Sequence, residues 1–180
     1  MQPSYYYTVF QTPLGWCGLV RGERGLRRVI FPVSTAGETE ECIRAEFSQV
    51  CLRSVRFKYW PKAFKRYFHR ERVSFLGQID LSGKSNFARA ILLACRRIPY
   101  GEIRSYGWLA RVVRRPKAAR PAGNVLARNP LPLVIPCHRV AKADGTLGGF
   151  SARGGSSLKA RLLQLEGIRI PLSGHLRELT

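Results

Sequence analysis

The segment NPLPLVIPCHRV, residues 129–140, restricts the fold of this chain more than any other stretch of its 180 residues. Three prolines interrupt an apolar run that ends in Cys137 and His138. Because proline fixes φ and removes an amide donor, this segment cannot continue a helix. We therefore expect a stiff, irregular loop that holds the thiol of Cys137 in one geometry.

Upstream of this loop, the first third of the chain has the pattern of strands and turns. Runs rich in aromatic and β-branched residues predict three strands, at 5–10, 15–20 and 26–31. Hydrophobic periodicity then predicts two helices, one over 38–50 and a short basic one over 61–70 that begins at Pro61. Residues 76–85 are expected to be a linker.

The second half of the chain predicts mainly helices. One ends before Pro99, one begins after Ser105 as N-cap, one spans about 117–128, and a last one covers 158–166 before Gly167. Two short helices around a basic turn suggest a helix-turn-helix. The fold class is therefore α+β, with an N-terminal α/β supporting domain at 1–80 and a mostly helical C-terminal domain at 86–172.

The net charge of the chain indicates which class of molecule it binds. The chain has 31 Lys and Arg against 11 Asp and Glu, a net charge of +20, and residues 84–180 carry 18 basic and 4 acidic residues. Such an excess favours a polyanion, with nucleic acid the first candidate and an acidic membrane surface the second. A solvated surface in an arginine-rich protein is the alternative, since 24 of the 31 cations are Arg. No apolar run reaches the length of a membrane span. We expect no secretion signal, because the first residues show no basic segment followed by an apolar stretch.

The cysteines predict reduced thiols in a cytosolic protein. There are five, an odd number, and none forms a CxxC pair. A zinc site is the alternative, although its candidate ligands match no compact spacing: Cys17, Cys42, Cys51 and His69.

Cys137 and His138 together suggest nucleophilic chemistry. A thiolate is the reactive form of cysteine, and an adjacent imidazole can take the thiol proton directly or through water. An acid must then orient the imidazole, and Glu166, at the end of an amphipathic helix, is the best placed of the three acids downstream. The alternative is a buried structural cysteine beside an incidental histidine.

Five pieces of the second half, in order, carry a resemblance to a known family: IPYGEIRSYGWLA, PKAARPAG, NPLPLVIPCHRV, GTLGGFS and LLQLEG. They resemble the O6-alkylguanine-DNA alkyltransferases, also called methylated-DNA–protein-cysteine methyltransferases. The resemblance covers about residues 86–167, and the PCHRV core is highly specific. The first half is compatible with the family's variable N-terminal domain but does not identify it.

The resemblance implies a fold, an activity and a partner. The N-terminal domain would be ribonuclease H-like with an antiparallel sheet, and the C-terminal domain would carry a helix-turn-helix that enters the minor groove. The activity would be DNA repair by single-turnover transfer of the alkyl group from O6-alkylguanine in duplex DNA to an internal cysteine, with base flipping. O4-alkylthymine stays open as a second substrate. The protein would be a monomer without a metal, organic cofactor or membrane, in the cytoplasm at the nucleoid, or in the nucleus if eukaryotic.

The resemblance also assigns roles by position. Cys137 would accept the alkyl group, His138 would act as a water-mediated base, Glu166 would orient it, and Asn129 would brace the loop. The substrate and DNA would be bound by a second set of residues: Tyr106 at guanine N3 and the 3′ phosphate, Arg120 as the finger that replaces the flipped base, Phe150 and Ser151 as pocket walls, Lys159 beside the pocket, and Val140, Ala119 and Gly123.

Two departures and two alternatives remain. Pro121 follows Arg120, so the recognition helix must either start near Pro121 or kink there. The segment SARGGSSLKA is about two residues longer than the family pattern, which affects the alignment of Lys159 and Glu166. A non-catalytic alkyltransferase-like lesion-binding protein is one alternative, but such proteins lack the acceptor cysteine. A cysteine hydrolase unrelated to DNA is the other, and the basic C-terminal half argues against it.

Overall fold

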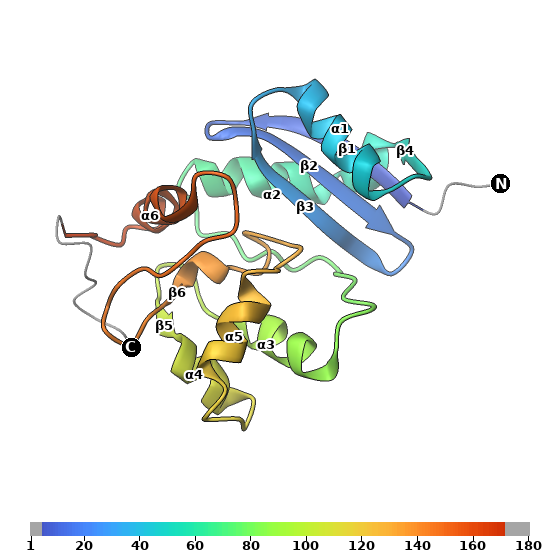
Figure 1. Ribbon diagram of the computed structural model, residues 1–180. Coiled ribbons are helices and arrows are strands. Elements are labelled where there is room, and N and C mark those ends of the chain that lie inside the picture. The colour runs from blue at the N-terminus through green and yellow to red at the C-terminus, as the bar shows by residue number, and fades with distance from the viewer. Residues whose placement is uncertain (1–4, 172–180) are drawn as a thin grey trace. The chain divides into compact units, whose positions relative to one another are not determined.

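The structure, a computed structural model, describes residues 5–171. The chain divides into two compact units, Met1–Ser82 and Gly83–Thr180. Over the described residues the architecture is mixed α/β, with six α-helices and a four-stranded sheet (Figure 1). None of these helices is long and apolar enough to cross a membrane.

The first unit is built on a sheet with the strand order β3-β2-β1-β4. Strands β1 (Tyr5–Thr12), β2 (Gly15–Gly22) and β3 (Gly25–Val33) pair antiparallel and confirm the three predicted strands. Strand β4 (Val50–Leu52) is parallel to β1 and was not predicted, because three residues are too few for alternation to be visible. Gly25 is required at its turn: φ is +125°, and a Cβ atom there would lie 2.6 Å from the Gln78 carbonyl.

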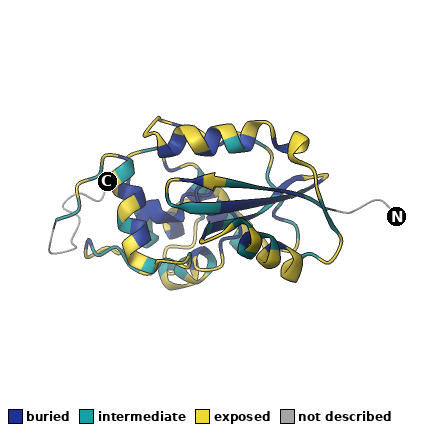
Figure 2. Ribbon diagram, turned by 90° about the horizontal axis from the view of Figure 1, so that it is seen from above, coloured by how far each residue is buried: buried dark blue, intermediate teal, exposed yellow. Residues whose placement is uncertain are grey.

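Two helices cover opposite faces of this sheet (Figure 2). Helix α1 (Ala36–Glu46) begins after Thr35, whose side chain accepts from the Glu38 amide at 3.1 Å, and its Ile43 packs against Tyr7 and Val20. Helix α2 (Tyr59–Phe68) follows a 3-10 turn, Ser54–Phe57, and its aromatic rings meet Phe10 and Phe31. Apolar residues on both faces of the strands thus bury the core of the unit.

Two expectations for the first unit are wrong at their edges. The helix predicted over 38–50 ends at Glu46, because Phe47 has extended geometry and Val50 pairs with Tyr5 in the sheet. The predicted linker 76–85 is partly attached to the sheet. The Leu26 amide donates to the Gln78 carbonyl at 2.9 Å, and the Asp80 amide donates to the Leu26 carbonyl at 2.7 Å.

The second unit is mostly helical. Its helices are α3 (Asn86–Arg96), α4 (Tyr106–Val112), α5 (Ala119–Leu126) and α6 (Gly155–Leu165). Strands β5 (Arg104–Ser105) and β6 (Val140–Ala141) pair in parallel. This pairing places the start of α4 beside the 3-10 turn Cys137–Arg139, because the first strand leads directly into α4 and the second follows that turn.

The position at which α5 begins explains how a proline can follow Arg120. Helix α5 starts at Ala119, two residues later than predicted, so Pro121 is its third residue. Amides in the first turn of a helix have no partner within the helix, and proline is tolerated there. At the other end of the unit, α6 begins three residues earlier than predicted and is followed by Glu166 and by Gly167 at φ +84°.

Candidate active site

Cys137 is the first residue of a short 3-10 turn. The prolines before it keep the preceding loop out of α-helical geometry. Asn129 fixes the whole loop. Its Oδ1 accepts from the Leu131 amide at 3.0 Å, while its Nδ2 donates to the Ile135 carbonyl at 2.8 Å and to the Cys137 sulfur at 3.1 Å. One side-chain amide therefore sets both the shape of the loop and the position of the thiol.

Cys137 lines a cavity of about 710 Å³ although it is only 5% exposed. The cavity is lined by three segments: the start of α4, the residues of α5, and the loop 142–151. Within the described part of the chain, the residues lining it include no Asp or Glu. Gly148 leaves room for the Tyr106 side chain, since a Cβ atom there would come within 3.3 Å of the Tyr106 hydroxyl, whereas one at Gly123 would make ordinary contact with the ring at 3.6 Å.

Burial makes the Cys137 thiol harder to ionise. It raises the pKa of the thiol, while the Asn129 amide, the Lys159 ammonium and the backbone amides of Cys137 and His138 act in the opposite direction. The free thiol is therefore protonated at neutral pH, and formation of the thiolate needs a nearby proton acceptor.

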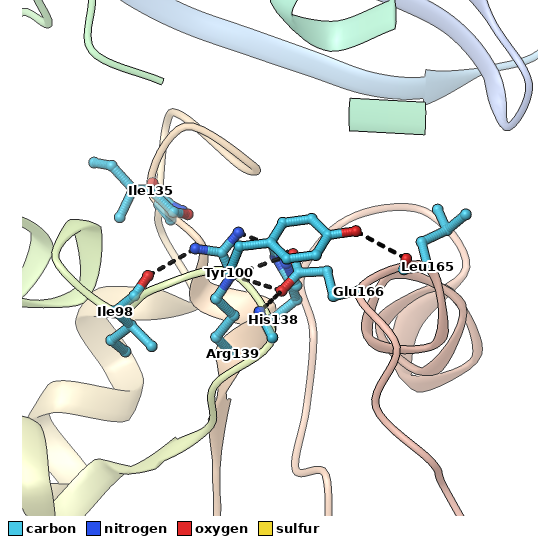
Figure 3. A network of polar contacts seen from close by, with 9 residues as sticks. Ile98, Tyr100, Ile135, His138, Arg139, Leu165 and Glu166 are labelled. Carbon is cyan, nitrogen blue, oxygen red and sulfur yellow. Dashed lines mark hydrogen bonds and ion pairs between the residues drawn. The ribbon is translucent and has the colours of Figure 1, made fainter. Parts of the chain in front are cut away.

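Behind the loop, Glu166 joins His138 to Arg139 (Figure 3). The His138 Nε2 lies 2.7 Å from Glu166 Oε1, and the Arg139 guanidinium donates to both carboxylate oxygens at 2.8–3.1 Å. Because an ionised carboxylate can only accept, Nε2 carries the proton and Nδ1 of the neutral imidazole is the acceptor. Burial lowers the pKa of His138, although Glu166 acts to raise it, and this burial keeps the ring neutral.

The carboxylate of Glu166 stays ionised in this buried position. Burial acts to raise its pKa, but the hydrogen bonds from His138 and Arg139 and the positive charge of Arg139 outweigh it and lower the pKa to about 2. The Gly101 amide also donates to Glu166 Oε2 at 3.0 Å. A permanent negative charge therefore lies beside the imidazole.

Sequence reasoning missed Arg139. Its guanidinium also donates to the Ile98 carbonyl at 2.7 Å, so it links the end of α3, the Cys137 turn and the end of α6. The sequence does carry one signal for this role. A buried arginine needs an acidic partner, and the second half of the chain has only four acids from which that partner can come. Which acid it meets depends on tertiary structure, because Glu166 is 27 residues away.

Lys159 is fully buried and is not among the residues that line the cavity. Its Nζ donates to the carbonyl of Val140 at 2.6 Å and to that of Leu147 at 2.5 Å, which ties α6 to β6 and to the loop 142–151. Burial lowers the pKa of Lys159 to about 8, against the opposing influence of Cys137. Val140 takes part through its backbone carbonyl, since its side chain is completely buried.

The predicted site residues form two layers. Seven line the cavity: Tyr106, Ala119, Arg120, Gly123, Cys137, Phe150 and Ser151. The others are buried residues that do not line it: Asn129, His138, Val140, Lys159 and Glu166. Lys142 and Asn124 also line the cavity and were not predicted.

The alternative zinc site finds no counterpart in residues 5–171. In that range no group of three or more His, Cys, Asp and Glu side chains is arranged to hold a metal ion. Cys17 is buried, whereas Cys42 is exposed.

Comparison with known proteins places this geometry in a family. A family model described as 6-O-methylguanine DNA methyltransferase, DNA binding domain, matches residues 86–168. The chain is 35% identical to a methylated-DNA–protein-cysteine methyltransferase of Methanosarcina acetivorans, over 90% of this chain and 98% of the relative. It is also similar to two Mycobacterium tuberculosis crystal structures.

The first of these is an O6-methylguanine methyltransferase, with 32% identity and a TM-score of 0.75 over 93% of this chain and 96% of that chain. The second is an OGT in complex with DNA, with 31% identity and a TM-score of 0.74 over the same shares of the two chains. Similarity of this extent spans both units of the chain. The chain belongs to the methylated-DNA–protein-cysteine methyltransferase family.

Proposed function

We propose that this protein repairs duplex DNA by transferring the alkyl group of O6-alkylguanine to Cys137, once per molecule. The observation that carries the proposal is a buried cysteine, its thiol positioned by Asn129, that lines a cavity of about 710 Å³ in a strongly basic unit. The lesion oxygen is stacked inside a duplex, so the base must be flipped out to reach such a thiol.

The residues around Cys137 have complementary roles in the transfer. The sulfur forms a bond to the alkyl carbon as the carbon–oxygen bond breaks, and the bonding electrons leave with guanine. The thiol proton passes through water to His138, whose imidazolium is stabilised by Glu166. The Tyr106 hydroxyl donates to guanine N3 as negative charge develops, and guanine then takes up a proton. Burial raises the pKa of Tyr106, which keeps that donor protonated.

Helices α4 and α5 are proposed to act as a helix-turn-helix at the minor groove. The exposed Arg120, in the first turn of α5 and on the cavity lining, would fill the gap left by the flipped base. Ala119 and Gly123 permit close approach to the sugar–phosphate backbone. The first unit is proposed to be a ribonuclease H-like support, and the site of action is the nucleoid or, in a eukaryote, the nucleus.

Intact mass spectrometry tests the proposal. Incubation with a duplex that contains O6-methylguanine should add the mass of one methyl group to the peptide that carries Cys137, with saturation at one equivalent. Cys137→Ser should bind the same duplex and gain no mass. Turnover of excess lesion by substoichiometric protein, or tight lesion binding by the wild type without any mass gain, would contradict the proposal.

A further inference from the structure

The positive charge of the first unit is concentrated in one short segment. Residues 1–82 contain 13 Lys and Arg and 7 Asp and Glu, and residues 53–72 alone hold eight of these cations and one of these acids, Glu71. The rest of the unit has five cations and six acids. All three lysines of the unit also lie in this segment: Lys58, Lys62 and Lys65. An arginine-rich composition therefore does not account for it.

The fold leaves all eight cations of this segment exposed. Helix α2 buries its apolar side chains, among them Trp60, Phe64 and Tyr67, and leaves Lys62, Lys65 and Arg66 exposed. The flanking turns add exposed cations at both ends of α2: Arg53, Arg56, Lys58, Arg70 and Arg72. We call residues 53–72 the basic segment.

Contacts beside α2 extend this surface onto the sheet. The Arg56 guanidinium stacks over the Tyr6 ring at 4.1 Å, and Arg21 of β2 donates to the Arg56 carbonyl at 2.9 Å. Arg21 thereby brings a further cation next to the basic segment.

This arrangement is unfavourable for the helix itself. Lys62 has one cation four residues before it, Lys58, and two cations three and four residues after it, Lys65 and Arg66. Like charges at these spacings destabilise a helix. The first turn of α2 contains no acid, so Lys58 and Lys62 lie at the positive end of the helix dipole. Glu71, the one acid of the segment, pairs with Arg66 at 2.5 Å. A feature that opposes local stability in this way favours a binding role.

We propose that the basic segment is a second DNA-binding surface, which contacts the phosphate backbone of duplex DNA without reading its sequence. Lysines act as point charges on phosphates and release counterions, which gives affinity without base specificity. The choice of DNA among polyanions rests on the proposed function, because a unit linked to a DNA-repair domain meets phosphates at high effective concentration.

Lysine footprinting of the full-length protein tests this surface. An amine-reactive acetylating reagent is applied with and without an undamaged duplex, and the rates at Lys58, Lys62 and Lys65 are read by mass spectrometry. The duplex should slow all three at least threefold, and molar salt, which releases the DNA, should restore them. Unchanged rates at these three lysines, while the same duplex is bound, would overturn the proposal.

A matched pair of variants separates a local surface from net charge. Lys62→Gln/Lys65→Gln should lower the magnitude of the slope of log affinity against log salt by up to about 1.8, at about 0.9 per phosphate contact. Arg24→Gln/Arg44→Gln removes two exposed cations of the same unit outside the basic segment and should leave the slope unchanged. Equal losses in both variants would mean that net charge alone acts, and the proposal would fail.

Two further readouts distinguish the possible failures. Protection of the lysines by vesicles of equal parts phosphatidylserine and phosphatidylcholine, but not by duplex DNA, would replace this proposal with a lipid-binding surface. Transfer of a methyl group to Cys137 without any footprint would leave the proposed function intact and remove the second surface. A footprint on duplex DNA without methyl transfer would support the second surface and remove the proposed function.

Discussion

Asn129 is the residue on which the geometry of the thiol depends most directly. Asn129→Ala removes its bonds to Leu131, Ile135 and the Cys137 sulfur, and leaves the buried Leu131 amide without the Asn129 acceptor, while the Ile135 carbonyl still accepts from the Cys137 amide. We expect the free energy of unfolding to fall by about 2–4 kcal/mol and methyl transfer to slow. Denaturant unfolding and single-turnover kinetics measure the two effects. Asn124→Ala, at an exposed cavity position, is the control and should leave stability within about 0.5 kcal/mol.

Glu166 makes stability depend on pH in a defined direction. Its pKa is about 2 in the folded protein against an ordinary 4.5, so the unfolded chain binds more protons between these values. The stability contributed by the ionised carboxylate is complete above pH 4.5 and is lost as the pH falls towards 2. It amounts to about 3 kcal/mol, and we expect Glu166→Gln to remove this part of the pH dependence in denaturant unfolding.

The control for this pH dependence is Glu71→Gln. Glu71 belongs to an exposed ion pair with Arg66, so we expect its removal to change stability by less than about 1 kcal/mol at any pH. A pH profile of Glu166→Gln that matched the wild type would show that other groups cause the acid sensitivity.

At the scale of secondary structure elements, two helix caps offer a matched comparison. The Ser85 side chain accepts from the Ala88 amide at 3.2 Å at the start of α3, and the Ser105 side chain accepts from the Trp108 amide at 3.0 Å at the start of α4. Replacing either serine by alanine should lower stability by about 1 kcal/mol. Only Ser105→Ala should also slow methyl transfer, because Tyr106 follows it on the cavity lining. Equal rates in the two variants would argue against a role for the position of Tyr106.

The elements also show what sequence could predict. Ser105 as an N-cap, the three long strands and the stop at Gly167 follow from local chemistry, and the structure has them. The short strand β4 and the partner of Arg139 depend on residues distant in sequence, and periodicity carries no information about them. The two-layer arrangement of the site could not be predicted from periodicity either, because it arises from packing of α6 against the Cys137 turn.

At the scale of the whole molecule, the net charge of +20 should make the affinity for DNA depend on salt much more strongly than the maximal rate of alkyl transfer does. We expect the concentration of lesion duplex that gives half the maximal transfer rate to rise by about tenfold or more between about 50 and 200 mM salt, because bound phosphates release counterions. The maximal rate should change little, since the buried reacting groups are screened weakly. A maximal rate that fell as steeply as affinity would contradict this separation.

The low exposure of Cys137 has a consequence for the working life of the protein. A reagent that acts once is used up by any electrophile that reaches it, and small alkylating or oxidising compounds reach open thiols most easily. Because Cys137 is buried and burial raises the pKa of its thiol, we expect each copy to react slowly with such compounds before a flipped base arrives. Iodoacetamide should accordingly label the exposed Cys42 many times faster than Cys137 in the native protein, with the difference abolished on unfolding.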